Sequence, residues 1–154
     1  QRQMCIRDSS YSHQYKEIYQ SMDAFQADYE RISNCLTAAT GIKPLYYRFP
    51  GGSTEVTEKL QMTDLDAYFN AQGASYFDWN VIAANNTTDD VSVNKMVDSV
   101  MNGVALYDTS IVLMYDSVDR KMTAKSLDSI LDYLLKNGYE ILPIDENTIP
   151  IHHS

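Results

Sequence analysis

The chain has 154 residues, of which 44% are apolar and 21% charged, proportions that exclude a disordered tail, a collagen-like fibre and a coiled coil. Its formal net charge of -9 disfavours a nucleic-acid partner, because an acidic surface repels phosphate groups. No run of 18 apolar residues predicts a membrane-spanning helix, and two cysteines, Cys5 and Cys35, are too few for a disulfide framework.

Residues 1–8 show no helical or strand periodicity, and their apolar stretch is too short for a secretory signal. We interpret them as a non-native leader, of the kind that read-through of a sequencing adapter produces. The native fold is therefore expected to begin near residue 9, partway through a longer gene.

The first half of the chain alternates helical and strand patterns. Apolar residues from Met22 to Ala39 recur at intervals of three and four, which predicts a helix. Ser21 is expected to cap its N-terminus and Gly41 to end it. Pro50 and the two glycines after it stop a short β-like run. The predicted elements are a helix over 22–40, a strand over 45–49 and a helix over 55–72.

The second half repeats this pattern. The run at 110–115 is continuously apolar, which is typical of a strand buried on both faces. Thr123 is expected to cap the next helix, and Gly138 to end it. The predicted elements are a strand over 74–79, a helix over 91–102, a strand over 110–115, a helix between Thr123 and Gly138, and a strand over 139–142.

The last residues, 149–154, contain no run long enough to dock firmly on a domain. We predict a solvated tail. In the alternative, the paired imidazoles of His152 and His153 ligate a metal.

Strict alternation of helices and strands predicts a parallel α/β sheet, either open or rolled into a barrel. Such folds place their chemistry just past the carboxyl ends of the strands. Polar side chains and turn residues gather at these ends. The segments concerned are 48–52, 78–80, 115–117 and 143–145, with the N-terminal segment 10–13 expected at the same edge.

Each of these segments has a chemical and an ordinary interpretation. After Arg48, a Pro-Gly-Gly turn could present backbone N–H groups to an oxyanion, or could be a plain turn beside a surface arginine. Asp78 and Trp79 could hold a charged partner against an apolar wall, or could be a surface aspartate and a packing indole. Asp116 could stand at the site's mouth or simply in a turn. His13 could ligate a metal or be merely exposed.

Four segments, in this order, resemble the second to fifth motifs of the polysaccharide deacetylases, carbohydrate esterase family 4 with the NodB homology domain. They read Ser-Tyr-Ser-His-Gln-Tyr at 10–15, Arg-Phe-Pro-Gly-Gly-Ser at 48–53, Tyr-Phe-Asp-Trp-Asn at 76–80 and Ile-Val-Leu-Met-Tyr-Asp-Ser at 111–117. The stretch at 138–144 also resembles the last strand of this family. The likeness covers residues 10–153, and it identifies 9–148 as an N-terminally truncated deacetylase domain.

The resemblance implies a partial, distorted (β/α) barrel of the NodB type that lacks its first strands. It implies hydrolysis of N-acetyl groups on a glycan, here peptidoglycan N-acetylglucosamine, assisted by a divalent metal, usually zinc. It also implies a secreted or cell-surface protein. A barrel without its first strands leaves open edges, so we expect the isolated chain to self-associate.

The resemblance also implies roles for single residues. His13 would be a metal ligand and Arg48 would hold and tune the catalytic base. Asp78 would orient the general acid and raise its pKa. The Gly51 N–H would be the oxyanion donor. The wall of the acetyl pocket would be formed by the side chains of Pro50, Trp79 and Leu113.

Three departures from the family pattern bear on activity. The first motif, with the base and the metal-binding aspartate, is absent. Ser9 stands where the first metal-binding histidine is expected, and Tyr115 where the general acid histidine is expected. The 154 residues alone are therefore expected to be inactive. The alternatives are a non-catalytic glycan-binding protein of the same fold, and an unrelated α/β domain that matches by chance.

Overall fold

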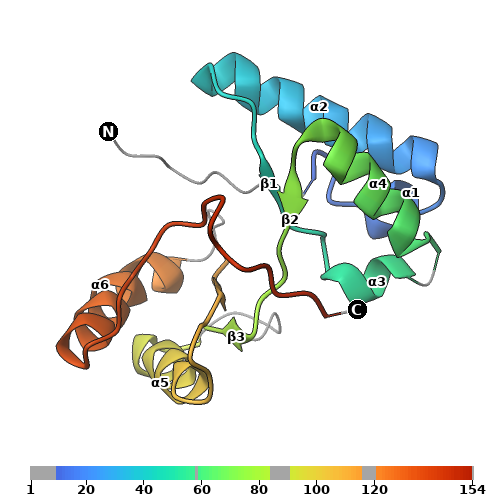
Figure 1. Ribbon diagram of the computed structural model, residues 1–154. Coiled ribbons are helices and arrows are strands. Elements are labelled where there is room, and N and C mark those ends of the chain that lie inside the picture. The colour runs from blue at the N-terminus through green and yellow to red at the C-terminus, as the bar shows by residue number, and fades with distance from the viewer. Residues whose placement is uncertain (1–9, 58, 84–90, 116–120, 154) are drawn as a thin grey trace. The chain divides into compact units, whose positions relative to one another are not determined.

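The computed structural model describes residues 10–57, 59–83, 91–115 and 121–153 (Figure 1). The chain divides into two compact units. The first runs to Asp78 and takes up the chain again from Ile144, and the second is Trp79–Pro143. Ser9, Asp116 and Ser117, which entered the predictions, lie outside the described residues.

The first unit holds four helices: α1 (Tyr15–Ile18), α2 (Met22–Thr40), α3 (Ser53–Thr57) and α4 (Met62–Gln72). The predicted helix over 22–40 is confirmed, with both of its end signals. The Ser21 hydroxyl accepts a hydrogen bond from the Ala24 N–H at 3.2 Å. Gly41 ends the helix in the left-handed region, at φ 74°, which glycine adopts without steric cost. The short α1 was not predicted.

The single helix predicted over 55–72 is wrong, because the chain forms α3 and α4 instead. The Val56 carbonyl accepts from both Lys59 and Leu60, which closes the first helix. Gln61 is extended, at φ -80° and ψ 128°, and its carbonyl begins the second helix. Val56, Leu60 and Leu65 are all buried, so the apolar residues on both sides of the break stay in the core.

Both pairs of strands are parallel, as predicted, and each forms a two-stranded sheet within the described residues. In the first unit, β1 (Tyr46–Tyr47) pairs with β2 (Ser75–Tyr76). In the second, β3 (Val81–Ile82) pairs with β4 (Val112–Leu113), and β3 was not predicted. The strands are shorter than the apolar runs that predicted them. No closed barrel forms among the described residues.

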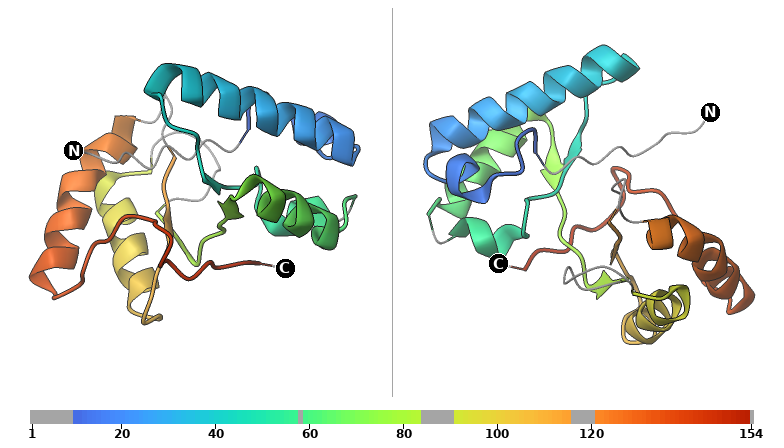
Figure 2. Two further views of the ribbon diagram at one scale, coloured as in Figure 1. Left: turned by 45° about the horizontal axis from the view of Figure 1, so that its top comes forward. Right: turned by 180° about the vertical axis from the view of Figure 1, so that it is seen from behind.

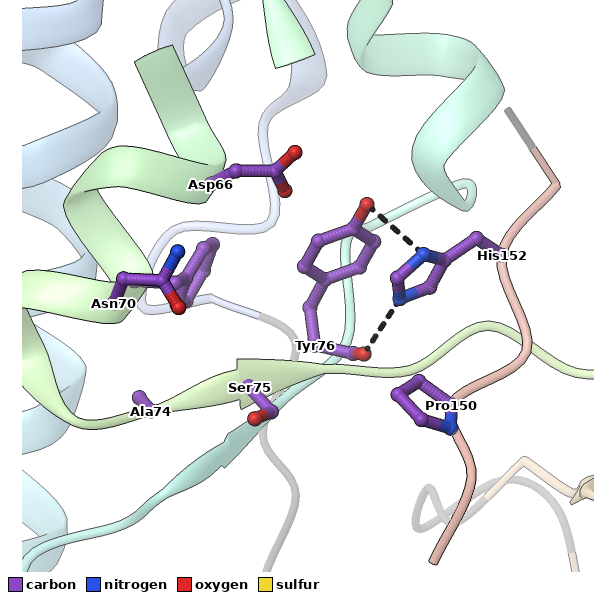
Figure 3. A pocket seen from close by; sticks show the side chains of 8 residues that line it. Asp66, Asn70, Ala74, Ser75, Tyr76, Pro150 and His152 are labelled. Carbon is purple, nitrogen blue, oxygen red and sulfur yellow. Dashed lines mark hydrogen bonds between the residues drawn. The ribbon is translucent and has the colours of Figure 1, made fainter. Parts of the chain in front are cut away.

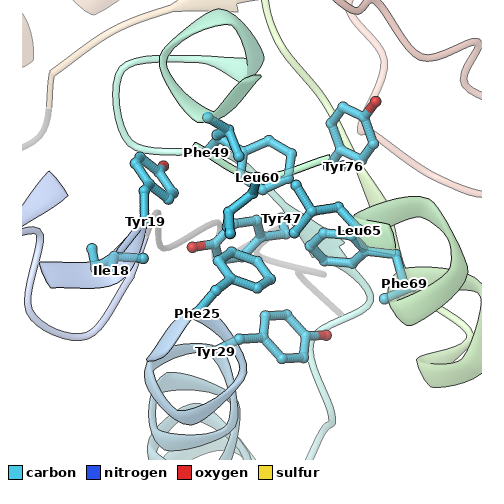
Figure 4. Packing of buried hydrophobic residues seen from close by; sticks show 12 residues of the cluster. Ile18, Tyr19, Phe25, Tyr29, Tyr47, Phe49, Leu60, Leu65, Phe69 and Tyr76 are labelled. Atoms are coloured by element: carbon cyan, nitrogen blue, oxygen red, sulfur yellow. The ribbon is translucent and has the colours of Figure 1, made fainter. Parts of the chain in front are cut away.

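The core of the first unit is aromatic (Figure 4). Phe25 of α2 is fully buried at its centre, with neighbouring ring centroids 5.7–6.4 Å away. Edge-to-face pairs at such distances add to the burial of apolar area. The rings around Phe25 are those of Tyr29, Tyr47, Phe49, Tyr68 and Phe69.

In the second unit α5 (Val93–Val104) and α6 (Lys121–Lys136) lie side by side (Figures 1 and 2). The helix predicted over 91–102 is confirmed with a shift of two residues, and Ser92 caps it by accepting from the Lys95 N–H. A Cβ on Gly103 would lie 2.6 Å from the Val81 side chain, so glycine lets α5 approach β3 closely.

Two predictions at α6 differ from the structure. Thr123 does not cap the helix, because α6 begins two residues earlier and Thr123 lies inside it, where its carbonyl accepts from the Ser126 hydroxyl. The apolar residues of α6, whose spacing of three and four predicted the helix, are only partly buried. Ile130 is in the core, whereas Leu127 and Leu135 are exposed.

The strand predicted over 139–142 is wrong. The Tyr139 N–H bonds to the Leu134 carbonyl at 3.0 Å, and Gly138 lies at φ 81°, so this stretch begins by closing α6. Leu142 is 69% exposed. A strand needs a neighbour for its backbone groups, and neither sheet of the described residues pairs with this segment.

Candidate functional site

Asp78 lies just past the end of β2 and is 1% exposed. Its Oδ1 accepts from the Ser53 N–H at 3.0 Å. Its Oδ2 accepts from the Ser53 hydroxyl at 2.5 Å and from the His153 N–H at 2.9 Å. The surface aspartate that the sequence allowed is therefore wrong. Three donors compensate the loss of water around a buried carboxylate.

The turn after Arg48 needs both of its glycines. Gly51 and Gly52 lie at φ 81° and 91°, and the Gly52 N–H donates to the Phe49 carbonyl at 2.9 Å. The Tyr19 hydroxyl donates to the buried Pro50 carbonyl at 2.9 Å and fixes the other side of the turn. That the Gly51 N–H is an oxyanion donor stays a prediction.

The space beside Gly51 is filled by neighbouring side chains. A Cβ there would lie 2.6 Å from Glu55 Cγ and 3.2 Å from the Tyr15 ring. The Tyr15 ring also lies 5.4 Å from the ring of His13. Tyr15 therefore bridges two of the predicted site segments. It closes the motif at 10–15, but the sequence assigned no role to it.

Arg48 is half-buried between the buried residues Tyr47 and Phe49. Its positive charge lowers the pKa of the Tyr19 and Tyr47 hydroxyls, but burial is the larger effect and raises both above the ordinary value. The guanidinium therefore lies close enough to these phenols to act on them, whereas a fully solvated arginine would be screened.

The segment before α1 is tied to α2. Asp28 accepts from the Tyr11 N–H at 2.8 Å and from the Ser12 N–H at 3.0 Å. The buried Ser10 hydroxyl accepts from the His13 N–H at 2.7 Å. Within the described part of the chain, His13 is the one residue other than glycine with a positive φ, 55°. Such strain persists only where the surroundings impose it, and it is frequent at functional sites.

The described residues do not by themselves fit a metal. No three histidine, cysteine or acidic side chains cluster among them. His13 is exposed, and one imidazole does not hold zinc tightly. The resemblance expects two further ligands beside His13. One is a histidine where Ser9 stands, outside the described residues, and the other is the aspartate of the family's first motif.

The prediction that the tail does not dock is wrong for residues 151–153, although His152 and His153 remain exposed. The Asp78 N–H donates to the Ile151 carbonyl at 2.7 Å. The His152 ring stacks on the Tyr76 ring at 4.1 Å and 14° (Figure 3). Its Nε2 lies 3.2 Å from the Tyr76 carbonyl oxygen and its Nδ1 lies 3.3 Å from the Tyr76 hydroxyl. Because a carbonyl only accepts, His152 Nε2 carries a proton in its contact with the Tyr76 carbonyl.

An open pocket of about 280 Å³ borders this tail (Figure 3). Residues from α4, from β2 and its start, and from the tail line it. They are Asp66, Phe69, Asn70, Ala74, Ser75, Tyr76, Pro150 and His152. The predicted strand end at 143–145 does not line it. Asp145 is exposed and accepts from the Asn147 N–H in a local turn.

The remaining predicted residues belong to the second unit. Leu113 is buried in β4, whereas Trp79 and Tyr115 are half-buried. Asn80 fixes its strand end, because its side chain donates to the Thr109 carbonyl and accepts from the backbone N–H of residue 111, both at 2.9 Å. In the first unit, Ser53 joins Asp78 to the turn that holds Pro50 and Gly51, and the sequence reasoning assigned no role to Ser53. No helix among the described residues is long and apolar enough to cross a bilayer.

The buried phenols predict a loss of stability at high pH. Burial, with help from the carboxylates of Asp66 and Asp78, raises the pKa of Tyr76 to about 12. The unfolded phenol ionises near 10. The stabilisation is therefore complete below pH 10 and is lost as the pH rises toward 12. We expect the free energy of unfolding in urea to fall steeply above pH 10, and a Tyr76→Phe variant to show a shallower fall; equal slopes would contradict the prediction.

Solved structures that are similar to this chain include the following three. The catalytic domain of a peptidoglycan N-acetylglucosamine deacetylase from Eubacterium rectale is 31% identical with a TM-score of 0.82, over 94% of this chain and 67% of its own length. A CE4 esterase from Streptococcus mutans is 23% identical with a TM-score of 0.73, over 87% and 60%. A polysaccharide deacetylase from Bacillus cereus is 19% identical with a TM-score of 0.77, over 96% and 70%.

The last two likenesses are of fold alone. The chain spans between 60% and 70% of these three solved chains. No protein-family model and no curated protein matches the sequence.

Proposed function

Since this chain belongs to the polysaccharide deacetylases of carbohydrate esterase family 4, we propose that the complete gene product hydrolyses N-acetyl groups on peptidoglycan N-acetylglucosamine. The likeness to the peptidoglycan deacetylase carries this proposal. The first unit supports it, because Ser53 joins the turn after Arg48 to the strand end at Asp78. A secreted or cell-surface protein follows from such a substrate.

We assign the described residues to roles in the hydrolysis of the amide. The Gly51 N–H would stabilise the oxyanion, and Arg48 would hold the base that an upstream segment supplies. Asp78 would orient the general acid. The family resemblance assigns the wall of the pocket for the acetyl methyl to apolar side chains. These are Pro50 in the first unit and Trp79 and Leu113 in the second.

The family resemblance implies a divalent metal, usually zinc, and His13 is the described residue that matches a ligand. Because one imidazole does not make a metal site, no step of the reaction is assigned to a metal here. The missing ligands and the base are expected from residues outside the described part of the chain.

Tyr115 favours a second candidate, a glycan-binding protein of the same fold without catalysis. A phenol donates a hydrogen bond but shuttles protons poorly near neutral pH, because its ordinary pKa is near 10. The enzyme is favoured by three residues that match the family's motifs, Arg48, Asp78 and Trp79.

The direct test is acetate release from peptidoglycan by the complete gene product, with and without a chelator. We expect release that the chelator abolishes and added zinc restores. The 154-residue chain is the negative control, since the family resemblance assigns the base to none of its residues. Glycan binding without acetate release, in both the native protein and a Tyr115→His variant, would instead establish the binding protein.

A further inference from the structure

We propose that residues 150–153 are a working part of the site, and that Ser53 is a positioning residue that couples the Pro50–Gly52 turn to Asp78. This inference rests on the proposed function for its catalytic consequence. The coupling between the tail, Ser53 and the turn is argued only from contacts within the first unit.

The tail occupies the free edge of β2. The N–H groups of Ser75 and Phe77 donate to the carbonyls of Leu45 and Tyr47, toward β1. Alternate backbone groups of a strand point to opposite edges. The intervening groups accordingly meet the tail. The Tyr76 carbonyl lies against His152 Nε2, and the Asp78 N–H donates to the carbonyl of residue 151. An edge left open would invite pairing with another chain.

The tail also completes the hydrogen bonds of the buried carboxylate. The His153 N–H lies 2.9 Å from Asp78 Oδ2 and 3.2 Å from the Ser53 hydroxyl oxygen. Asp78 is thus held by the tail through both its backbone and its side chain. Without this donor, Oδ2 would keep one partner in a place that water hardly reaches, which raises the free energy of the folded site.

Ser53 transmits this arrangement to the turn. It is fully buried, it follows Gly52 directly, and both its N–H and its hydroxyl donate to Asp78. On the other side of the turn, the Tyr19 hydroxyl holds the Pro50 carbonyl. Movement of Ser53 therefore moves the N–H groups of Gly51 and Gly52. A misplacement of about 1 Å in such donors can cost on the order of 100-fold in rate.

The variants that test this remove one donor each. His153→Pro deletes the N–H that reaches Asp78, and Ser53→Ala deletes the hydroxyl but keeps the N–H. His152→Ala is a milder variant that removes the stacked ring, in case the other two do not fold. Ile149→Ala is the matched control, because this side chain belongs to the same tail and is 79% exposed.

Amide hydrogen exchange in the complete gene product is the first measurement, since it needs no activity. We expect exchange at Gly51, Gly52 and Ser53 to rise at least about tenfold in His153→Pro and Ser53→Ala, and to stay unchanged in the control. Exchange within twofold of the native protein in every folded variant would overturn the proposal.

The second measurement is steady-state deacetylation. We expect kcat to fall about 10- to 100-fold with KM within twofold, because the turn acts on the transition state and not on glycan binding. A fall in kcat without a change in exchange at the turn would overturn the coupling. Faster exchange in a protein that releases no acetate under any condition would support the coupling and refute the proposed function.

Discussion

A Tyr115→His variant of the complete gene product should release acetate about 10²- to 10⁴-fold faster than the native protein, the usual contribution of a general acid. Tyr115 stands two residues past β4 and is half-buried, where the family resemblance expects a histidine. An imidazole with an ordinary pKa near 6.5 gives up and regains a proton near neutral pH, whereas a phenol retains it. The rate is measured by acetate release from peptidoglycan.

The control for this variant is Tyr107→His, at a tyrosine of the same unit that is 46% exposed and to which the family resemblance assigns no role. It should leave the rate unchanged. A folded Tyr115→His protein with a rate within twofold of the native one would contradict a general acid at this position. This result would favour a glycan-binding protein, in which the Tyr115 side chain contacts the sugar.

Local signals predicted the helices well. Ser21 and Gly41 mark the two ends of α2, because a hydroxyl cap and a left-handed glycine act within a few residues of the helix that they bound. The prediction of one helix over 55–72 failed at Gln61. The apolar pattern continues across α3 and α4, but the extended backbone of Gln61 separates the two helices.

The failures at the end of the chain have a non-local cause. A strand at 139–142 would need a neighbour that no sheet of the described residues supplies, and the pattern of the segment itself cannot tell whether one exists. Conversely, residues 151–153 lack any apolar run but dock through backbone groups and one stacked ring. Backbone hydrogen bonds leave no signature in the sequence of the residues that make them.

The candidate site was predicted in part for the same reason. Parallel strands bring their carboxyl ends to one edge, which selected Arg48 and Asp78. The contact that joins their segments is made by Ser53, across 25 positions, and by the His153 N–H, across 75. Burial of a carboxylate demands such donors, but the sequence does not say which residues provide them.

A Phe25→Ala substitution should lower the free energy of unfolding of the first unit by about 3–5 kcal/mol, the usual cost of removing a buried phenylalanine. Phe25 is fully buried at the centre of the ring cluster, so truncation removes contacts to five aromatic neighbours and leaves a cavity that rigid rings fill poorly.

Urea unfolding followed by near-ultraviolet circular dichroism of the tyrosines measures this loss. Ile42→Ala, at a side chain that is 69% exposed, is the control and should change the free energy by less than about 0.5 kcal/mol. A loss below 1 kcal/mol for Phe25→Ala would mean that the aromatic cluster does not stabilise the unit that carries Asp78, Ser53 and the turn. A loss of the expected size would tie the geometry of the site to this core, since α2 supplies both Phe25 and the Asp28 carboxylate that holds the segment before His13.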